Sequence, residues 1–478
     1  MSIEALKQKI QSRAFWESVA EKTLLPDRNM TRSSYLSKLA RLQDVNVVTS
    51  IMGQRRCGKS VIGRQYIKKL WDNGIPRKNV LYINFFLKPI ADVREEKNFI
   101  AIVEWWMEQL VDRAQPSLLV LDEVQELENW DKNVASIFED ASMPCRLIIT
   151  GSNSKMLSAD FSVKRAGRYT TLQVFPFSFA EFCQFTETGY VTNNIEKYLL
   201  AGGMPEVLKV HHEEQRIQLI SDIINSTVKD DIVLRYNPSN PGLLYALIDF
   251  CRTSFSQELS VKSISNTVLQ SIKLPRGNST GTQTTSSLVS TYIGYMQDAY
   301  FLYSPPTYSH RAKEILKRSV DKMYLGDLCL SDYKAQTQKG RLLENMVYIE
   351  LLRNNFKVQR YLGYRNKNLE IDFFVQKVSK SALIQVCWQL GDSSENRALW
   401  KREFGNLHYT NKDVPKFLVS LDDKIDSPYR DVEHLNIMQF LAWAEESSSL
   451  SDHTGYFSHP GGKSYGRISQ KKPHFNNN

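Results

Sequence analysis

Short apolar runs alternate with helical stretches between residues 44 and 186. Five of these runs have the length of a strand and are rich in β-branched or apolar residues. They are VNVVTSIM, NVLYINFF, SLLVLDEV, CRLIIT and TLQVFPF. Continuous apolar runs are typical of strands buried on both faces of a sheet. The pattern therefore predicts an α/β fold with a parallel sheet that is covered by helices on both sides.

The flanking segments differ from this pattern. Residues 1–43 read as a polar helical leader, and residues 187–310 read as mainly helical. Within the second segment, LSVKSISNTVL and SSLVSTYIGYMQDAYFL are two periodic stretches separated by the Gly-, Pro-, Ser- and Thr-rich stretch PRGNSTGTQT. This spacing predicts a helix-turn-helix arrangement over residues 259–304.

Residues 311–445 predict a further domain that contains both helices and strands. RLLENMVYIELLRN predicts an amphipathic helix, and FKVQRYLGYR, NLEIDFFVQK, ALIQVCWQL and FLVSL predict successive strands. Residues 446–478 are rich in Ser, Gly, Lys and Asn and poor in apolar residues, so we expect a disordered basic tail.

The composition is that of an ordinary globular protein. The chain has 478 residues, of which 42% are hydrophobic and 24% charged. It contains no apolar run long enough to span a membrane and no secretory stretch at its N-terminus, so we expect no membrane association and a cytoplasmic location. Six scattered cysteines form no C-x-x-C pair, which argues against zinc and disulfides.

The formal net charge is +9. A basic balance is compatible with a polyanionic partner such as DNA. However, residues 461–478 carry Lys463, Arg467, Lys471 and Lys472 and no acidic residue, so the tail accounts for much of the charge. The charge is therefore only slight evidence for nucleic-acid binding.

The sharpest motif is GQRRCGKS at residues 53–60, which fits G-x-x-x-x-G-K-[ST]. It follows a predicted strand and precedes the helical stretch VIGRQYIKKLW, which is the context that distinguishes a P-loop from a chance match. The loop's N–H groups and the helix N-terminus favour bound phosphate, while Lys59 reaches the β- and γ-phosphates and Ser60 ligates Mg²⁺. The predicted nucleotide-binding residues are Gly53, Gln54, Arg55, Arg56, Cys57, Gly58, Lys59, Ser60 and Val61.

The second half of a nucleotide site is expected at the end of another apolar strand, and LLVLDE at residues 118–123 supplies it. Asp122 is expected to hold Mg²⁺ through its water shell, and Glu123 to act as general base toward the attacking water. The alternative is an ordinary strand terminus. The strand between the two motifs and the Glu indicate the additional-strand, glutamate-using class of P-loop ATPases.

Two further residues are weaker candidates for catalysis. The strand CRLIIT is followed by Gly151, Ser152 and Asn153, and Asn153 is expected to contact the γ-phosphate and the water. Arg168 precedes the fifth strand and is a candidate to stabilise the transferred phosphoryl group, in the same subunit or in a neighbouring one. A plain turn and a surface arginine are the alternatives. Arg55 and Arg56 are expected to be solvated, with steering of phosphate or nucleic acid as the lesser alternative.

Together these motifs resemble prokaryotic and archaeal-type ATPases in which an AAA-like P-loop domain precedes a winged-helix region and a domain like the PD-(D/E)XK nucleases. The resemblance covers roughly residues 30–410. It is carried by GQRRCGKS, LLVLDEVQELENW, IITGSNSKML, AGRYTTLQVFPFSFAEF, AGGMPEV, GRLLENMVYIEL, EIDFFV and ALIQVC. It implies that residues 44–186 are the ATPase domain, that ATP is the nucleotide, and that Arg168 belongs to the family pattern.

The resemblance also implies a nuclease-like site that lacks part of its chemistry. Glu344 and Asp372 fill two positions of the family pattern, whereas Gln385 stands in place of the second strand carboxylate and Cys387 in place of the lysine. An amide is a weak Mg²⁺ ligand, and a thiol at neutral pH does not replace an ammonium group. We therefore expect a degenerate site, although Glu370 lies two residues before Asp372 and is a candidate to compensate.

Three functions follow as hypotheses. The leading one is an ATP-binding and ATP-hydrolysing protein whose nucleotide state controls the C-terminal regions. The second is a DNA-binding regulatory module that uses ATP as a slow switch, and the third is an ATP-dependent nuclease. A protein partner and a homo-oligomer are both left open by the sequence.

Overall fold

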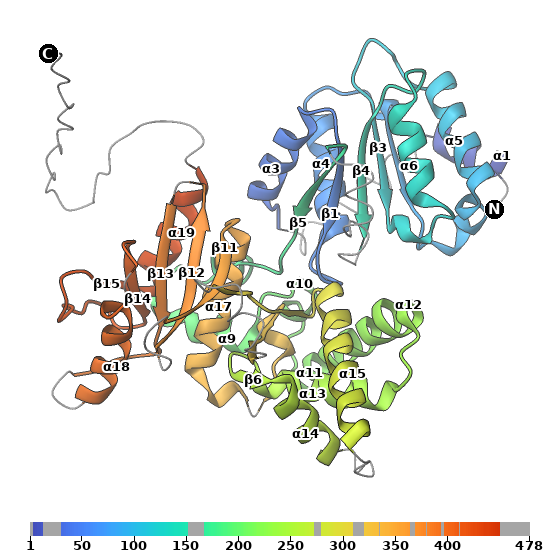
Figure 1. The fold of residues 1–478 in the computed structure, drawn as a ribbon. Helices are drawn as coiled ribbons and strands as arrows, with labels where there is room; N and C mark the ends of the chain where they lie inside the picture. The colour runs from blue at the N-terminus through green and yellow to red at the C-terminus, as the bar shows by residue number, and fades with distance from the viewer. Residues whose placement is uncertain are drawn as a thin grey trace, which may run out of the picture.

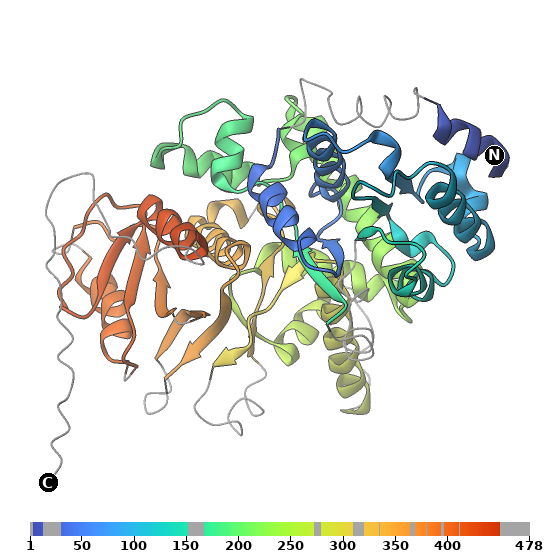
Figure 2. The same cartoon turned by 90° about the horizontal axis from the view of Figure 1, so that it is seen from above.

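The computed structural model describes residues 3–12, 30–151, 167–271, 279–308, 320–333, 335–363, 369–378, 380–392, 396–410 and 412–449. The chain forms a P-loop domain, a helical region and a third domain that contains a second large sheet (Figure 1). In both ribbon views the P-loop domain and the third domain lie on opposite sides of the molecule (Figure 2). In Figure 1 the helical region lies below the P-loop domain.

The first sheet has five parallel strands in the order β2-β3-β4-β1-β5. Its strands are β1 (Val48–Met52), β2 (Val80–Asn84), β3 (Leu118–Asp122), β4 (Arg146–Gly151) and β5 (Tyr169–Gln173). Each of the five apolar runs overlaps one of them. Residues of β1 and β3 are buried throughout, as expected of strands covered on both faces. The predicted parallel α/β sheet is therefore confirmed.

Two apolar cores cover the two faces of this sheet (Figure 1). One face packs against α3 (Ser33–Gln43) and α4 (Lys59–Asp72), and the other packs against α1 (Ile3–Gln11), α5 (Glu96–Gln109) and α6 (Trp130–Glu139). The predicted leader thus contributes α1 and α3 to this domain, through buried residues such as Leu6 and Leu39. Short 3-10 turns are η1 (Arg77–Asn79), η2 (Lys88–Arg94) and η3 (Val124–Glu126).

The helical region follows β5. Its first part comprises α8 (Phe179–Phe185), η5 (Thr192–Asn194), α9 (Ile195–Ala201), α10 (Pro205–Leu208), α11 (Glu213–Ser226), the π-helical turn η6 (Thr227–Val233) and α12 (Leu234–Tyr236). Its second part comprises α13 (Pro241–Ser254), β6 (Glu258–Ser260), α14 (Val261–Ser271), α15 (Ser279–Asp298) and β7 (Leu302–Tyr303). Helix α15 begins at Ser279, inside the stretch that the sequence predicted as a loop, because Ser and Thr also favour helix starts.

Later strands return to this helical region. Strand β9 (Val320–Lys322) pairs antiparallel with β6, and β10 (Tyr324–Leu325) pairs antiparallel with β7. The turns η7 (Leu328–Leu330) and η8 (Ala335–Thr337) follow. The boundary predicted between residues 310 and 311 lies outside the described residues, and the strands β9 and β10 that follow it still pair with strands of the helical region.

The third domain has a six-stranded sheet in the order β15-β14-β13-β12-β11-β8. Pairing is antiparallel between β11, β12 and β13, and parallel for the other neighbours. The strands are β8 (Thr307–Tyr308), β11 (Lys357–Leu362), β12 (Glu370–Lys377), β13 (Lys380–Val386), β14 (Lys416–Ser420) and β15 (Glu433–Asn436). Helices α17 (Lys339–Arg353) and α19 (Ile437–Ser449) cover one face, and α18 (Arg397–His408) covers the other.

Helix α17 is buried on all sides instead of showing the amphipathic pattern that the sequence predicted. Every residue from Leu342 to Leu351 is buried, including Glu344, Asn345 and Glu350. The reason is that the helix packs against its own sheet and also against α9 and η7 of the helical region, so the two parts share one core.

Within the described ranges, we find no helix with both the length and the apolar character that crossing a membrane requires. Helix α19 extends to Ser449, so the predicted tail is helical at its start. The remainder of that tail lies outside the described residues.

Candidate nucleotide-binding site

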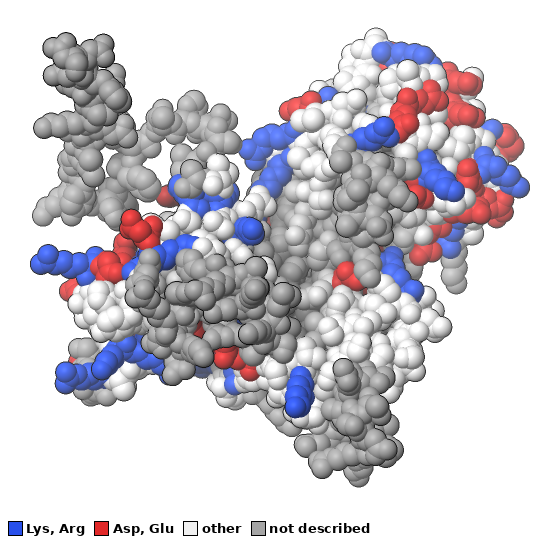
Figure 3. Space-filling view, viewed as in Figure 1, with Lys and Arg blue, Asp and Glu red and all other residues white. Residues whose placement is uncertain are grey.

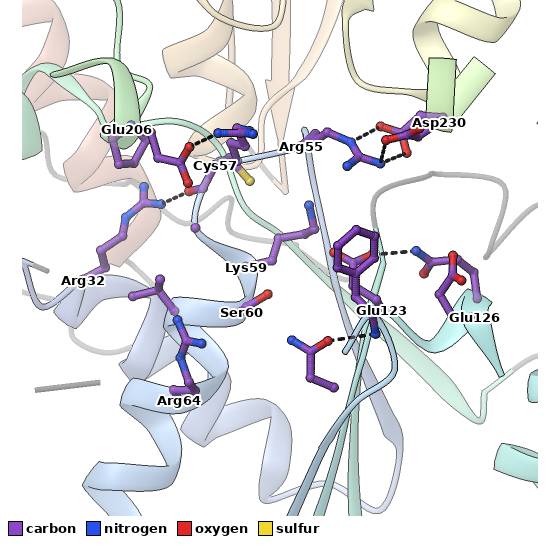
Figure 4. A pocket seen from close by; sticks show the side chains of 18 of the residues that line it. Arg32, Arg55, Cys57, Lys59, Ser60, Arg64, Glu123, Glu126, Glu206 and Asp230 are labelled. Atoms are coloured by element: carbon purple, nitrogen blue, oxygen red, sulfur yellow. Dashed lines mark hydrogen bonds and ion pairs between the residues drawn. The ribbon is translucent and has the colours of Figure 1, made fainter. Parts of the chain in front are cut away.

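A cavity of about 800 Å³ lies where the P-loop domain meets the helical region (Figure 4). Its floor is the carboxyl edge of the sheet, where β1, β2 and β3 end. The P-loop domain lines it with Met30, Arg32, residues 55–61, Arg64, Asn84, Phe86, Glu123, Gln125, Glu126 and Phe177. The helical region lines it with Pro205, Glu206, Lys209, Asp230, Asp231, Leu234 and Arg235.

The loop between β1 and α4 has the backbone geometry that its glycines predict. Gly53 has a φ of 153°, and a Cβ added there would lie 2.1 Å from the carbonyl oxygen of Val174. Gly58 has a φ of 102° and precedes the first residue of α4, Lys59. A residue other than glycine would therefore strain the backbone at either position. The loop wraps tightly enough to direct N–H groups at a bound phosphate.

Lys59 is buried, and its ammonium group lies over its own loop. The Nζ atom donates to the carbonyl oxygens of Gly53 at 2.9 Å and Gln54 at 3.0 Å. Figure 4 shows the side chain beside the cavity, close to Ser60 and facing the end of β3. These contacts keep the cation at the mouth of the loop, where a phosphate would bind. Gly53 and Gln54, which were also predicted to bind nucleotide, do not line the cavity.

Asp122 is fully buried at the end of β3 and accepts four hydrogen bonds. Ser60 Oγ and Thr150 Oγ1 donate to Oδ1, with the serine at 2.9 Å. Tyr82 Oη and Asn84 Nδ2 donate to Oδ2, at 2.6 and 3.0 Å. Burial, together with the Asp122 carboxylate, raises the pKa of Tyr82. Ser60 and Asp122 thus present two oxygen ligands side by side, which suits Mg²⁺.

Glu123 has a left-handed backbone, with a φ of 55°. Its N–H donates to Thr150 Oγ1 at 3.1 Å, and its Oε2 accepts from Gln125 Nε2 at 2.6 Å. The carboxylate lines the cavity next to Asp122, in the place predicted for a general base. The sequence did not predict the Gln125 contact, although the residue lies only two positions along the chain.

The two P-loop arginines are paired with carboxylates, and Arg55 is partly buried whereas Arg56 remains exposed to solvent. Arg55 makes a bidentate contact with Asp231 at 2.9 and 3.1 Å, and it lies 3.4 Å from Asp230 (Figure 4). Arg56 pairs with Glu206. Burial opposes the charge on Arg55, but the contact with Asp231 outweighs it and raises the pKa of the guanidinium. The acidic partners come from α10 and η6, so no local sequence pattern could have predicted them.

A third arginine on the cavity wall was also missed by the sequence analysis. Arg32 donates from Nη1 to the carbonyl oxygen of Cys57 at 3.1 Å (Figure 4). Its Nε and Nη2 atoms both donate to Glu181 on α8, each at 2.7 Å. Arg32 therefore fixes the P-loop backbone from outside the motif.

Arg168, one of the two weaker catalytic candidates, does not line the cavity. Arg168 lies just before β5, at the amino edge of the parallel sheet, and pairs with Glu139. The cavity lies at the opposite edge of the sheet, so Arg168 does not face the cavity of its own subunit, and its catalytic role stays a prediction. Asn153 lies outside the described residues.

Arg235 and Lys209 line the cavity from the helical region, and no sequence motif marked them.

The structure brings three of the nuclease-like candidates together: Glu344 and Asp372 through Lys322, and Gln385 through a hydrogen bond with Asp372. Glu344 on α17 and Asp372 on β12 are both buried and share a contact with Lys322. Gln385 on β13 bonds to Glu403 at 3.0 Å. Cys387 follows β13, and burial raises the pKa of its thiol to about 12.

Glu370 is not placed to compensate for the missing carboxylate. It lies on β12 with Asp372, but it pairs with Arg360 at 2.9 Å and is half-buried. The neighbouring ladder contains a register shift between Gln359 and Tyr361, opposite this stretch of β12.

Two parts of the chain match models of known protein families. Residues 45–183 match the family model described as an AAA domain. Residues 192–339 match a domain of unknown function, DUF8612. An uncharacterized protein of Haemophilus influenzae is 28% identical over 398 residues, which is 82% of this chain and 93% of that protein. Uncharacterized protein MJ1544 of Methanocaldococcus jannaschii is 26% identical over 420 residues, covering 84% and 88%.

Solved structures give more distant similarities. The Walker-type ATPase paby2304 of Pyrococcus abyssi aligns with 63% of this chain and 95% of its own, at 13% identity and a TM-score of 0.41. AMPPCP-bound DnaA from Aquifex aeolicus aligns with 55% and 93%, at 14% identity and a TM-score of 0.28. The AAA family match and the geometry of the loop, Ser60, Asp122 and Glu123 together identify residues 45–183 as an AAA-type P-loop ATPase domain.

Proposed function

We propose that the protein binds ATP with Mg²⁺ and hydrolyses it, and that its nucleotide state controls the helical region and the third domain. The observation that carries the proposal is the grouping of Lys59, Ser60, Asp122 and Glu123 around one cavity whose opposite wall belongs to the helical region. Nucleotide bound there would contact both parts of the chain.

Each residue has a separate task in this proposal. The N–H groups of the loop and of the first turn of α4 bind the phosphates, and Lys59 supplies a positive charge. Ser60 and Asp122 hold Mg²⁺, which neutralises the charge that develops on the phosphate oxygens. Glu123 accepts a proton from the attacking water. Gln125 and Thr150 orient Glu123 through their hydrogen bonds to it.

The two loop arginines provide the link to the helical region. Arg55 and Arg56 lie inside the phosphate-binding loop, and their carboxylate partners lie on α10 and η6. Phosphates brought into the loop attract the same guanidinium groups and repel the same carboxylates. Nucleotide binding is therefore expected to weaken these pairs and change how the helical region sits on the loop.

The remaining regions complete the proposal as a winged-helix region and a degenerate nuclease-like domain. Helices α13, α14 and α15 with the β6–β9 pair support the first part. The succession α17, β11, β12, β13, α18 and β14 supports the second part. In this proposal neither region cleaves nucleic acid.

ATP turnover by the purified protein tests the proposed activity. We expect turnover that depends on Mg²⁺ and that Glu123→Gln reduces by about 100-fold or more while ATP still binds, because the proton acceptor is lost but the phosphate contacts remain. Lys59→Ala should lose ATP affinity. Turnover in the Glu123→Gln variant equal to that of the parent protein, or undiminished ATP affinity in Lys59→Ala, would contradict the proposal.

The same assay with duplex DNA addresses the DNA-binding alternative. Figure 3 shows Lys and Arg mixed with Asp and Glu over the face in view. We therefore expect turnover to be indifferent to DNA. Stimulation by DNA that falls steeply as salt increases would favour the DNA-coupled alternative.

A further inference from the structure

A buried cluster in the third domain combines two carboxylates with one ammonium group. Glu344 on α17 and Asp372 on β12 face each other, and Lys322 of β9 lies between them. Lys322 Nζ is 2.6 Å from Glu344 Oε1 and 2.8 Å from Asp372 Oδ1. The side chains of Lys322 and Asp372 are each 7% exposed, and that of Glu344 is 11% exposed. The lysine comes from the strand that pairs with β6, so it belongs to the helical region and not to the third domain.

The other contacts of the carboxylates are also made within the protein. Tyr324 Oη donates to Glu344 Oε1 at 2.7 Å, and the N–H of Val386 donates to Asp372 Oδ2 at 2.9 Å. Gln385, which replaces a strand carboxylate of the nuclease pattern, accepts from the backbone N–H of Asp372 at 3.3 Å and donates to Glu403 at 3.0 Å. Across the described part of the chain, no group of three His, Cys, Asp or Glu side chains is arranged to hold a metal ion.

The position of the ammonium group decides what this centre can bind. A divalent cation that bridged Glu344 and Asp372 would need the space between their oxygens, because metal–oxygen distances are about 2.0–2.6 Å. Lys322 Nζ already lies there at hydrogen-bond distance from both. Two like charges cannot share that site, and removing the lysine would leave two buried carboxylates without a counter-ion.

The next strand, β10, is held by further contacts with α17. The Asn345 side chain bonds to the backbone N–H and C=O of Leu325 at 2.8 and 3.0 Å. The rings of Tyr324 and Tyr348 stack with centroids 4.1 Å apart. Glu344, Asn345 and Tyr348 thus hold β9 and β10 along one face of the helix.

We infer that Lys322 is the resident cation of the Glu344–Asp372 centre, and that this centre docks the helical region onto the third domain in place of binding a divalent metal. This inference does not depend on ATP hydrolysis. It concerns a carboxylate pair whose chemistry in a nuclease would be metal binding, and it assigns that pair a structural role between two regions of the chain.

Removal of the ammonium group tests the inference directly. Lys322→Met keeps the length of the side chain but leaves the carboxylates facing each other. We expect its melting temperature without metal to fall by several degrees, and Mn²⁺ to restore part of that loss. Adding Asp372→Asn to this variant should abolish the Mn²⁺ response, whereas Lys322→Arg should behave like the parent protein. Mn²⁺ bound at the P-loop contributes equally to all of these proteins and cancels in the comparison.

The parent protein compared with Asp372→Asn gives a second test that does not require Lys322→Met to fold. Equal Mn²⁺ binding by the two proteins, measured by water-proton relaxation, would uphold the inference. A Mn²⁺ site present in the parent protein and lost in Asp372→Asn would overturn it, as would Mn²⁺-dependent DNA cleavage that Asp372→Asn removes. An unchanged melting temperature in Lys322→Met without a Mn²⁺ response would also overturn it.

Discussion

At the scale of single residues, the nucleotide site is held together by polar side chains around Asp122. That carboxylate is fully buried, so each of its oxygens needs hydrogen-bond donors to offset the cost of desolvation. Tyr82 and Asn84 of β2 and Thr150 of β4 supply donors from the neighbouring strands. The orientation of the carboxylate toward Ser60 is therefore fixed before nucleotide binds, which favours rapid assembly of a Mg²⁺ site.

The hydrogen bond from Gln125 to Glu123 gives a prediction at this scale. If Gln125 orients the general base, Gln125→Ala should lower kcat about tenfold and leave ATP affinity unchanged, because one hydrogen bond of about 1–1.5 kcal/mol is lost. Steady-state kinetics and equilibrium ATP binding measure the two quantities. A rise in kcat would mean instead that Gln125 holds Glu123 away from the water.

The sequence predicts the parts of the site that lie on one continuous segment. Strand, loop and helix around residues 53–60 carry their own pattern, and Asp122 and Glu123 end an apolar run. The partners that cross between elements were not predicted, because Tyr82, Thr150 and Asp231 become neighbours only after the chain folds. Lys322 is the clearest example, since it lies 50 residues from Asp372 in the sequence.

At the scale of secondary-structure elements, α8 joins the P-loop to α17. Ser178 and Glu181 form a capping box at the start of α8. The Glu181 carboxylate also accepts from Arg32, which contacts the P-loop, and lies 3.9 Å from Arg353 at the end of α17. Arg353 in turn donates to the carbonyl oxygen of Pro176 at 2.8 Å. One short helix thus fixes the end of a third-domain helix against the nucleotide domain.

Glu181 therefore predicts a specific pH dependence of stability. Burial opposes its charge, but Arg32 outweighs this and lowers the pKa of Glu181 below its ordinary value of 4.5. A lowered pKa stabilises the folded protein above pH 4.5, and the contribution is lost as the pH falls through the folded value. We expect Glu181→Gln to cost about 3–5 kcal/mol at pH 7, because it leaves buried Arg32 without a counter-charge.

Thermal unfolding as a function of pH measures this effect. The difference in melting temperature between the parent protein and Glu181→Gln should narrow below pH 4.5. Glu196→Gln is a matched control, since Glu196 pairs with Lys339 but is about half exposed. It should change stability by about 1 kcal/mol or less. A constant difference for Glu181→Gln across the acidic range would contradict the assignment.

In the third domain, the positions of the helices and strands along the chain were predicted better than their burial. The strands of residues 356–421 and the helix near residue 341 lie where the periodicity placed them. The burial of α17 on every side could not be predicted, because its polar residues suggested a solvated face. Glu344, Asn345 and Glu350 are instead satisfied inside the core by Tyr324, Leu325 and Arg353.

At the scale of the whole molecule, the three parts contact one another through polar groups at each junction. Arg55 and Arg56 connect the P-loop to the helical region, and Lys322 connects that region to the third domain. The apolar core that runs from the helical region into the third domain makes those two parts one packed body. In the proposed function, a change at the P-loop reaches the third domain through the helical region, and the Arg55 contact is its first step.

The contact between Arg55 and Asp231 predicts that Asp231 affects how the helical region responds to ATP. In the parent protein, ATP should change hydrogen exchange in α11 and η6, because phosphates compete with Asp231 for Arg55. Asp231→Asn weakens the pair before ATP arrives, so the ATP-dependent change in hydrogen exchange should shrink. ATP affinity should stay within about threefold of that of the parent protein, since Asp231 would make no favourable phosphate contact.

Asp222→Asn on the exposed face of α11 is the control and should leave the response intact. Exchange mass spectrometry with and without a non-hydrolysable ATP analogue measures it. An unchanged response in Asp231→Asn would show that nucleotide state reaches the helical region by another contact, such as Arg56 with Glu206.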